Sequence, residues 1–213
     1  MIKSATFETS CTDLASTKKL DPLPQYAFVG RSNVGKSSLL NMLCNRKGLA
    51  VTSSTPGRTR LINFFRIELG MAKPLCEEGK ARQSNPEAKS KNSTIFFVDL
   101  PGYGYAAASK SAKYGWGETI TEYLTKSTLL RRVFVLLDIR HKPSAHDEAM
   151  LHFLQQHGIP FTILATKSDK FSRAQISNHV RTLAQHLGVG IDNIIATSAK
   201  STLGRDAVMS ILN

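Results

Sequence analysis

The stretch that decides the fold is Gly30-Arg31-Ser32-Asn33-Val34-Gly35-Lys36-Ser37. It follows a short apolar run that ends at Val29 and leads into an amphipathic segment that begins at Leu39. Glycines in such a stretch let the backbone curl so that several N–H groups face one point, and the dipole of the following helix favours an anion there. The pattern predicts a phosphate-binding loop between a strand and a helix. The alternative is a glycine-rich turn that binds nothing.

The loop ends in two side chains suited to a nucleotide. Lys36 is expected to reach the outer phosphates, and the hydroxyl of Ser37 is expected to hold a magnesium ion.

Strand-like and helix-like patterns alternate after residue 25. The predicted strands are residues 26–29, 62–69, 95–99, 133–138, 161–166 and 194–198. The predicted helices are residues 36–46, 113–130, 146–157, 173–187 and 203–212. Such alternation predicts an α/β protein, a three-layer sandwich around a mostly parallel sheet. Ligand sites in this architecture lie at the carboxyl ends of the strands.

Two stretches stand apart from this alternation. Residues 1–24 carry a mixed pattern and are expected to form an N-terminal extension that packs on a domain spanning 25–213, with Phe7 and Leu14 as anchors. Residues 70–93 are rich in Lys, Glu, Ser, Asn and Pro, with too few apolar groups to offset the entropy of ordering. A mobile insertion is therefore expected there. The alternative is a loop that contacts RNA or a protein partner.

The overall composition limits the classes of partner and the compartment that we expect. The formal charge of +12 indicates an anionic partner beyond the nucleotide, with RNA as the first choice and a basic surface that serves solubility as the alternative. The three widely spaced cysteines fit neither a disulfide framework nor a zinc site. Apolar runs fall well short of the roughly 20 residues of a membrane span. A cytoplasmic monomer without a membrane partner is expected.

A second motif, Asp99-Leu100-Pro101-Gly102, closes the apolar strand predicted at 95–99. Asp99 is expected beside the magnesium site, acting through a water. The amide of Gly102 can meet a γ-phosphate because no side chain blocks its approach. The alternative is an ordinary turn.

A third motif, Thr166-Lys167-Ser168-Asp169, closes the strand predicted at 161–166. The carboxylate of Asp169 can accept hydrogen bonds from guanine N1–H and from its exocyclic amine, whereas adenine offers no such pair of donors. The sequence therefore predicts selection of GTP and argues against a nucleotide kinase or another ATP-driven enzyme. Lys167 is expected to lay its aliphatic stem along the base, and the backbone N–H groups of Ser198-Ala199-Lys200 to meet the guanine carbonyl. The alternative for Asp169 is a charged turn.

Between these motifs lies Thr55-Pro56-Gly57-Arg58-Thr59, which has neither a helical nor a strand period. A loop that brings a threonine hydroxyl to magnesium would be ordered only while the γ-phosphate is present. Thr59 is the preferred ligand and Thr55 its competitor. The alternative is a Pro-Gly turn.

With these motifs, and with Asp138-Ile139-Arg140-His141, the chain resembles the EngB family, also called YihA or YsxC, of Era-like bacterial ribosome-assembly GTPases. The resemblance covers most of residues 25–200. It implies a small GTPase-like G domain of the P-loop NTPase type, with Ser37 and Thr59 as the magnesium ligands. It also implies a role in large ribosomal subunit assembly and a need for the protein in normal cell division and septation. The chain departs from the family in its longer 70–93 loop and in a looser pattern after Ile194.

The expected reaction is attack of water on the γ-phosphorus of GTP. Tyr103 stands where many GTPases place a water-orienting glutamine, so intrinsic turnover should be slow. Asn33 is expected to help ligate a potassium ion, or else only to cap the turn. The alternative function is an RNA-binding assembly factor that binds GTP and GDP with negligible unaided hydrolysis.

The predicted catalytic residues are Asn33, Lys36, Thr59 and Gly102. The predicted nucleotide-binding residues are Gly30, Arg31, Ser32, Asn33, Val34, Gly35, Lys36, Ser37, Gly57, Arg58, Thr59, Arg60, Leu61, Asp99, Leu100, Pro101, Gly102, Thr166, Lys167, Ser168, Asp169, Thr197, Ser198 and Ala199.

Overall fold

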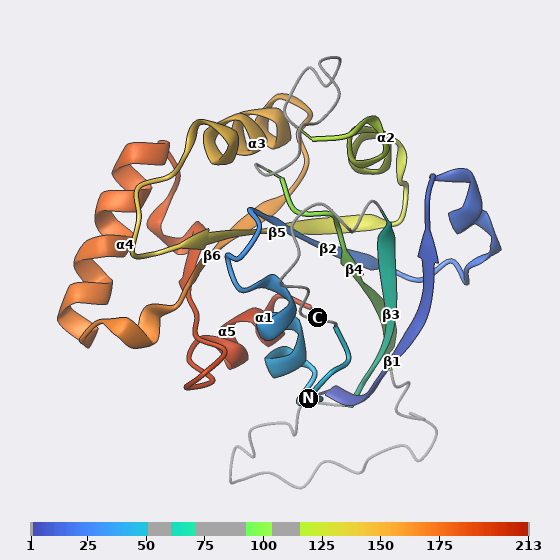
Figure 1. The fold of residues 1–213 in the computed structure, drawn as a ribbon, viewed down its shortest axis with the longest axis horizontal. Helices are drawn as coiled ribbons and strands as arrows, with labels where there is room; N and C mark the ends of the chain where they lie inside the picture. Colours follow the sequence, from blue (N-terminus) through green and yellow to red (C-terminus); the bar gives the residue numbers. More distant parts are fainter. Residues whose placement is uncertain (1, 51–60, 71–92, 104–115, 213) are drawn as a thin grey trace, which may run out of the picture.

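Seven strands form a single sheet, in the order β1-β3-β4-β2-β5-β6-β7 (Figure 1). The computed structural model describes residues 2–50, 61–70, 93–103 and 116–212. The strands are β1 (Ile2–Cys11), β2 (Gln25–Gly30), β3 (Ile62–Leu69), β4 (Ser93–Asp99), β5 (Leu130–Asp138), β6 (Phe161–Thr166) and β7 (Ile194–Ala196).

The sheet is mostly parallel, as predicted. β4, β2, β5, β6 and β7 run parallel to their neighbours, and only the pairs β1–β3 and β3–β4 are antiparallel among the described strands. The carboxyl ends of five strands therefore meet at one edge of the sheet, where an α/β protein binds its ligands.

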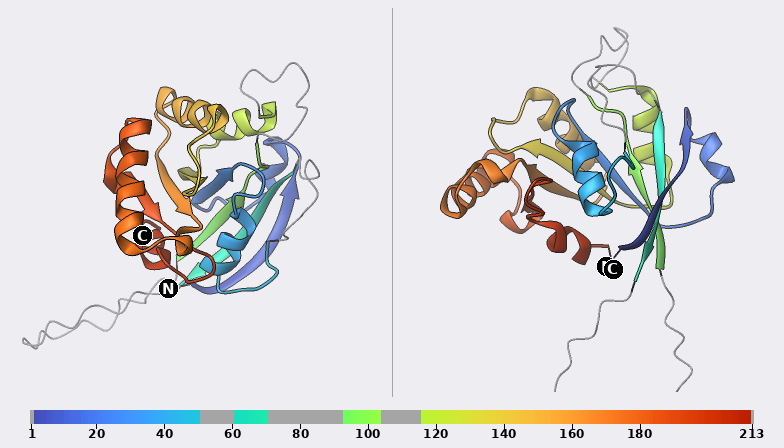
Figure 2. Two further views of the ribbon diagram at one scale, coloured as in Figure 1. Left: turned by 60° about the vertical axis from the view of Figure 1, so that its left-hand side comes forward. Right: turned by 60° about the horizontal axis from the view of Figure 1, so that its bottom comes forward.

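Helices cover both faces of the sheet, which confirms the three-layer sandwich. They are α1 (Lys36–Leu43), α2 (Glu118–Lys126), α3 (Ala145–Gln156), α4 (Arg173–Leu187) and α5 (Arg205–Ser210). One apolar core joins the sheet to α2, α3 and α4, and a second joins it to α1 and α5. Figures 1 and 2 show the two helix layers on opposite sides of the strands.

The central strand β2 contributes to both cores. Ala27 and Val29 face the first core, and Tyr26 and Phe28 face the second. The ring of Phe28 lies 5.0 Å from that of Phe134, measured between centroids. Burial of a side chain of this size stabilises the fold by about 1.5–3 kcal/mol. Because β2 is packed on both faces, the loop that follows it starts from a rigid point.

Local sequence signals fix the start and the end of α4. Ser172 and the side chain of Gln175 form a reciprocal capping box at its first turn, and Gly188 ends it with a left-handed φ of 62°. The bounds predicted for this helix, for β3 and for β6 are confirmed.

Other predicted boundaries are wrong. Residues 2–11 form strand β1, which the sequence did not indicate, because its partner β3 lies about sixty residues away in the chain. α2 ends at Lys126 instead of residue 130, because the backbone of Ser127 is extended and Leu130 already begins β5. α1, α5 and β7 are each shorter than predicted. Residues 71–92, most of the predicted insertion, lie outside the described part of the chain.

Across the parts of the chain that the structure describes, each helix is too short or too polar to cross a lipid bilayer.

The connection from β7 to α5 depends on one glycine. Gly204 has a left-handed φ of 76°, and a Cβ placed there would lie 2.3 Å from the carbonyl oxygen of Ala196. Two residues along from Ala196, the Ser198 amide donates to the Leu203 carbonyl at 3.1 Å. The close approach of Gly204 to β7 thus holds the loop at residues 198–203 in place.

We expect Gly204→Ala to destabilise the protein by about 3 kcal/mol, since it adds a backbone clash to the cost of a left-handed alanine. The matched control is Gly188→Ala, where φ is 62° and a Cβ would meet nothing within 4 Å. That control should cost about 1 kcal/mol. Urea unfolding measures both, and equal losses would contradict the role given to Gly204.

Candidate functional site

The phosphate loop predicted at residues 30–37 forms a compact turn between β2 and α1. Asn33 and Gly35 both have left-handed backbones, with φ of 64° and 103°. The amide of Val34 donates to the carbonyl of Arg31 at 3.2 Å, and the Val34 side chain is buried beneath the loop. Asparagine tolerates a left-handed backbone better than most residues do, which accounts for its presence at position 33.

The loop places a cation and an anion side by side at its mouth. Lys36 begins α1 and Asp99 ends β4, and the Lys36 ammonium forms an ion pair with the Asp99 carboxylate. Both side chains are largely shielded, with 13% and 10% of their surfaces exposed. The parallel pairing of β2 with β4 sets this proximity, because it brings Phe28 level with Asp99.

The segment after Asp99 runs directly beside the loop. The amide of Leu100 donates to the Phe28 carbonyl at 3.0 Å, and the amide of Tyr103 donates to the Gly30 carbonyl at 3.3 Å. The Ser32 amide in turn donates to the Tyr103 carbonyl at 3.4 Å. Gly102 is therefore held against the phosphate loop.

Tyr103 points into the protein core. Its side chain is 2% exposed, and its hydroxyl donates to Asp147 Oδ1 at 2.8 Å. Asp147 also caps α3, because its Oδ2 accepts from the amide and the hydroxyl of Ser144. Burial, together with the nearby Asp147 charge, raises the pKa of Tyr103 well above its ordinary value. The phenol is thus a neutral donor, and sequence reasoning had given Asp147 no role.

The end of β6 is tied to the phosphate loop. The hydroxyl of Thr166 lies 2.8 Å from the Val34 carbonyl and 3.1 Å from the Leu137 carbonyl. The ammonium of Lys167 donates to the Asn33 carbonyl at 2.8 Å. The third motif and the phosphate loop therefore form one continuous surface.

Asp169 faces the loop that follows β7. Its Oδ1 accepts from the Ser198 hydroxyl at 2.7 Å, and this hydrogen bond is the main reason why the pKa of Asp169 is lowered. The Ser198 oxygen also accepts from the amides of Lys200 and Ser201. Within the described residues the amide of Ala199 makes no hydrogen bond, and Ala199 is exposed. The carboxylate and this free N–H lie on neighbouring loops.

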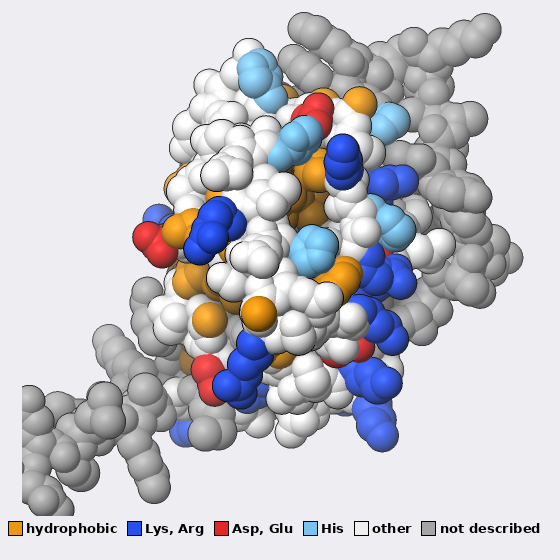
Figure 3. Space-filling view, turned by 90° about the vertical axis from the view of Figure 1, so that its left-hand side faces the viewer, with side chains coloured by type: hydrophobic (Ala, Val, Ile, Leu, Met, Phe, Trp, Pro, Cys, Tyr) orange, Lys and Arg blue, Asp and Glu red, His pale blue; other side chains and the backbone are white. Residues whose placement is uncertain are grey.

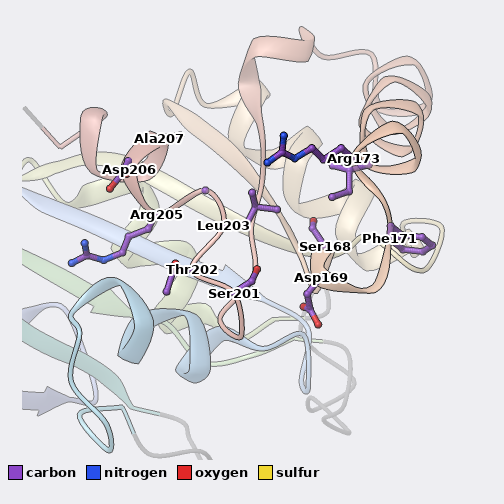
Figure 4. Close-up of a pocket in the computed structure, with 12 residues that line it drawn as sticks. Ser168, Asp169, Phe171, Arg173, Ser201, Thr202, Leu203, Arg205, Asp206 and Ala207 are labelled. Atoms are coloured by element: carbon purple, nitrogen blue, oxygen red, sulfur yellow. The ribbon is translucent and has the colours of Figure 1, made fainter.

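A cavity of about 620 Å³ opens beside Asp169. Figure 4 shows Phe171 and Arg173 on its α4 side, and Ser201, Thr202 and Leu203 on the side of the β7–α5 loop.

Most of the predicted site residues come together at this edge of the sheet. They are residues 30–37, 99–102, 166–169 and 197–199. Gly57, Arg58, Thr59 and Arg60 lie outside the described residues, as does the competitor Thr55. Leu61 directly precedes β3, and its side chain is 36% exposed.

The donor set at the loop mouth suits magnesium. The Ser37 hydroxyl would be a direct oxygen ligand and the Asp99 carboxylate could accept from a bound water, and oxygen ligands are those this ion prefers. Ser37 Oγ makes no hydrogen bond within the described part of the chain.

The sequence matches the family model described as "50S ribosome-binding GTPase" over residues 25–167. The probable GTP-binding protein EngB of Heliobacterium modesticaldum is 42% identical over 194 residues, which cover 91% of this chain and 83% of that protein. The corresponding protein of Desulfosudis oleivorans is 37% identical over 212 residues, which cover 100% of this chain and 95% of that protein.

Solved structures support the same fold. The crystal structure of a probable GTP-binding protein engB has a TM-score of 0.55 at 19% identity, covering 88% of this chain and 96% of that chain. Aquifex aeolicus Era bound to GDP and AlF4⁻ has a TM-score of 0.60 at 21% identity, covering 88% of this chain and 55% of that chain. On the sequence matches, the chain belongs to the EngB family of GTP-binding proteins and is a GTPase.

Proposed function

We propose that this protein binds GTP and GDP, hydrolyses GTP slowly, and acts as a nucleotide-dependent switch in the assembly of the large ribosomal subunit. The observation that carries the proposal is the carboxylate of Asp169, held by Ser198 at 2.7 Å on a surface continuous with the phosphate loop. By resemblance to its family, the protein acts in the cytoplasm and is needed for normal division and septation, and we expect it to act as a monomer.

Asp169 selects guanine because this base offers two hydrogen-bond donors to the carboxylate. Its lowered pKa keeps it ionised at neutral pH, so both oxygens accept hydrogen bonds from guanine N1–H and the exocyclic amine. The free amide of Ala199 donates to the guanine carbonyl. An adenine in the same place would leave the carboxylate without matched donors, which is costly for a desolvated charge.

The other end of the site binds the phosphates. Lys36 and the amides of the loop hold the β- and γ-phosphates, and the Gly102 amide contacts the γ-phosphate. Ser37 and Thr59 would hold a magnesium ion, with Asp99 acting through a water, and the ion would supply positive charge to offset that of the phosphates. The position of Gly102, fixed by the contacts of Tyr103 with the loop, supports this assignment.

Slow hydrolysis follows from the side chain after Gly102. A glutamine there would orient the attacking water, but the Tyr103 hydroxyl donates to Asp147 in the core. The same observation favours the second candidate function, an RNA-binding assembly factor with negligible unaided hydrolysis. The GTPase switch and this binding factor differ in whether GTP is turned over without a partner.

The partner is ribosomal RNA or a pre-ribosomal particle. The formal charge of +12 exceeds what a nucleotide site needs. Figure 3 shows Lys and Arg side chains following one edge of the face that carries α4. A surface of this kind attracts a phosphate backbone without reading its sequence. The family description, a ribosome-binding GTPase, supports the same partner.

Asn33 would supply a ligand for a potassium ion, whose charge would help to offset the charge of the transition state. Its side chain is exposed and makes no hydrogen bond within the described residues, so its amide oxygen is available. This does not support the alternative that the side chain caps the turn.

We expect Asp169→Asn to weaken GDP binding by about 100-fold, because an amide cannot accept both guanine bonds. The same variant should gain affinity for xanthosine diphosphate, whose base carries a carbonyl where guanine carries the amine. Calorimetry measures both ligands. In the unmodified protein, ATP should not displace labelled GDP, and strong displacement would contradict guanine selection.

GTP turnover should be severalfold faster in potassium than in sodium at equal ionic strength. Asn33→Gly keeps the left-handed backbone and deletes the oxygen, so it should abolish the difference between the two salts. Phosphate release measures the rates. Equal rates in the two salts for the unmodified protein would contradict the proposal that Asn33 is a potassium ligand.

The protein should sediment with large ribosomal subunits in the presence of a non-hydrolysable GTP analogue and not in the presence of GDP. The reason is that the surface that contacts the subunit forms only when the γ-phosphate is bound. Gradient co-sedimentation measures this difference. Single-turnover hydrolysis with and without the particles then separates the two candidate functions. Equal sedimentation in both nucleotides would contradict a switch.

A further inference from the structure

Asp138 is the centre of a charged cluster that the functional assignment leaves unused. It ends β5, and its side chain is 15% exposed. Oδ1 accepts from Arg140 Nε at 2.9 Å and from the Arg140 amide at 3.1 Å. Oδ2 accepts from the Arg140 guanidinium at 2.7 Å and from the ammonium of Lys167 at 2.9 Å. The two-pronged contact with Arg140 leaves the carboxylate a single orientation.

Lys167 stands between this carboxylate and the phosphate loop. Its ammonium contacts Asp138 on one side and the Asn33 carbonyl on the other, at 2.9 and 2.8 Å. Its backbone is left-handed, with a φ of 61°, an uncommon conformation for a lysine. Its side chain is 30% exposed. Both ends of the side chain are therefore fixed, and the four-carbon stem between them has little freedom.

The cluster joins three segments that lie apart in the sequence. They are the phosphate loop, the end of β5 and the turn that follows β6. Burial alone would raise the pKa of Asp138, but the hydrogen bonds from Arg140 and Lys167 outweigh it and hold the pKa well below its ordinary value. The carboxylate is thus a permanent anion at neutral pH.

We propose that Asp138 is a positioning residue for nucleotide binding, which holds the Lys167 stem where it covers the base and thereby slows nucleotide release. This rests on the proposed guanine site. Asp138 does not contact the nucleotide and does not choose the base, because an aliphatic stem packs on any purine. Arg140 acts one step further away by orienting the carboxylate.

The direction in which nucleotide binding changes when Asp138 is removed distinguishes positioning from a simple electrostatic effect. Asp138 is an anion close to a site for a highly charged anion, so its removal should tighten binding if charge alone mattered. Positioning predicts the opposite. Without Asp138, the long Lys167 side chain regains rotamers that it must give up again when a nucleotide binds.

We expect Asp138→Asn to speed GDP release about tenfold, with little change in the association rate. The preference for GDP over ADP should stay as in the unmodified protein, because Asp169 sets it. Stopped-flow measurement with a fluorescent GDP analogue gives both rates. The matched control is Asp192→Asn, which removes an exposed carboxylate on the turn before β7 and should leave release unchanged.

A double-variant cycle shows whether Asp138 acts through Lys167. If it does, Asp138→Asn combined with Lys167→Met releases GDP no faster than Lys167→Met alone, whereas independent effects multiply. A merely structural role would lower stability without this coupling, and urea unfolding without nucleotide measures that separately. Multiplicative effects, or unchanged release in Asp138→Asn, overturn the proposal.

Arg140→Ala keeps the proposal testable if Asp138→Asn does not fold. Arg140 is exposed, and its loss should speed release about threefold by freeing the carboxylate. Unchanged release in this variant also counts against positioning. Failure of the unmodified protein to bind GDP would instead contradict the proposed function, so the two failures are distinct.

Discussion

One hydroxyl group joins the two halves of the site. Strand β5 lies between β2 and β6 in the sheet, yet Thr166 at the end of β6 reaches the Val34 carbonyl in the loop after β2. The same hydroxyl lies close to the Leu137 carbonyl of β5. Thr166 is buried, so its single proton is shared between these two carbonyls without competition from bulk water. The distance between the phosphate loop and the turn that carries Asp169 is set at this point.

Hydrogen bonds around Ser198 set the far side of the site in a similar way. The Ser198 hydroxyl holds Asp169, and its oxygen accepts two amides of its own loop. Beneath it, the Ser168 amide donates to the Thr197 carbonyl at 3.1 Å, with both residues fully buried. The polar groups that would contact a base are therefore positioned by buried neighbours. A site of this kind is organised before its ligand arrives, which reduces the entropy lost on binding.

Much of this could be predicted from sequence because its signals are local. The phosphate loop lies between an apolar strand and a helix, and α4 carries its own caps within a few residues of each end. Strand β1 has no such signal. Only Ala5 and Cys11 are buried along it, and two shifts in its register with β3 break the alternation of inward and outward residues. An edge strand that owes its position to a distant partner cannot be read from its own pattern.

The same reason explains which site residues were missed. Asp138 was visible as a carboxylate at the end of a strand, but its role depends on Arg140 and Lys167 meeting it in space. Asp147 gave a local signal as the acidic member of a capping box, but not its contact with Tyr103. Arg140 is only two residues from Asp138, but the Asp138–Lys167 and Asp147–Tyr103 pairs join segments that lie far apart in the chain. Pattern and propensity describe neighbours along the chain, so they do not reach these contacts.

The contacts of Tyr103 limit how the site can respond to a nucleotide. Its backbone is bonded to the phosphate loop on both sides, through Gly30 and Ser32, and its side chain is bonded to the first turn of α3. If Gly102 moves on loss of the γ-phosphate, either Tyr103 stays and the movement is small, or its buried bond to Asp147 breaks. Breaking that bond leaves a buried carboxylate short of a donor, which raises the cost of a large movement. A large rearrangement at Gly102 must therefore reach α3, which makes the first turn of that helix part of the response to the nucleotide.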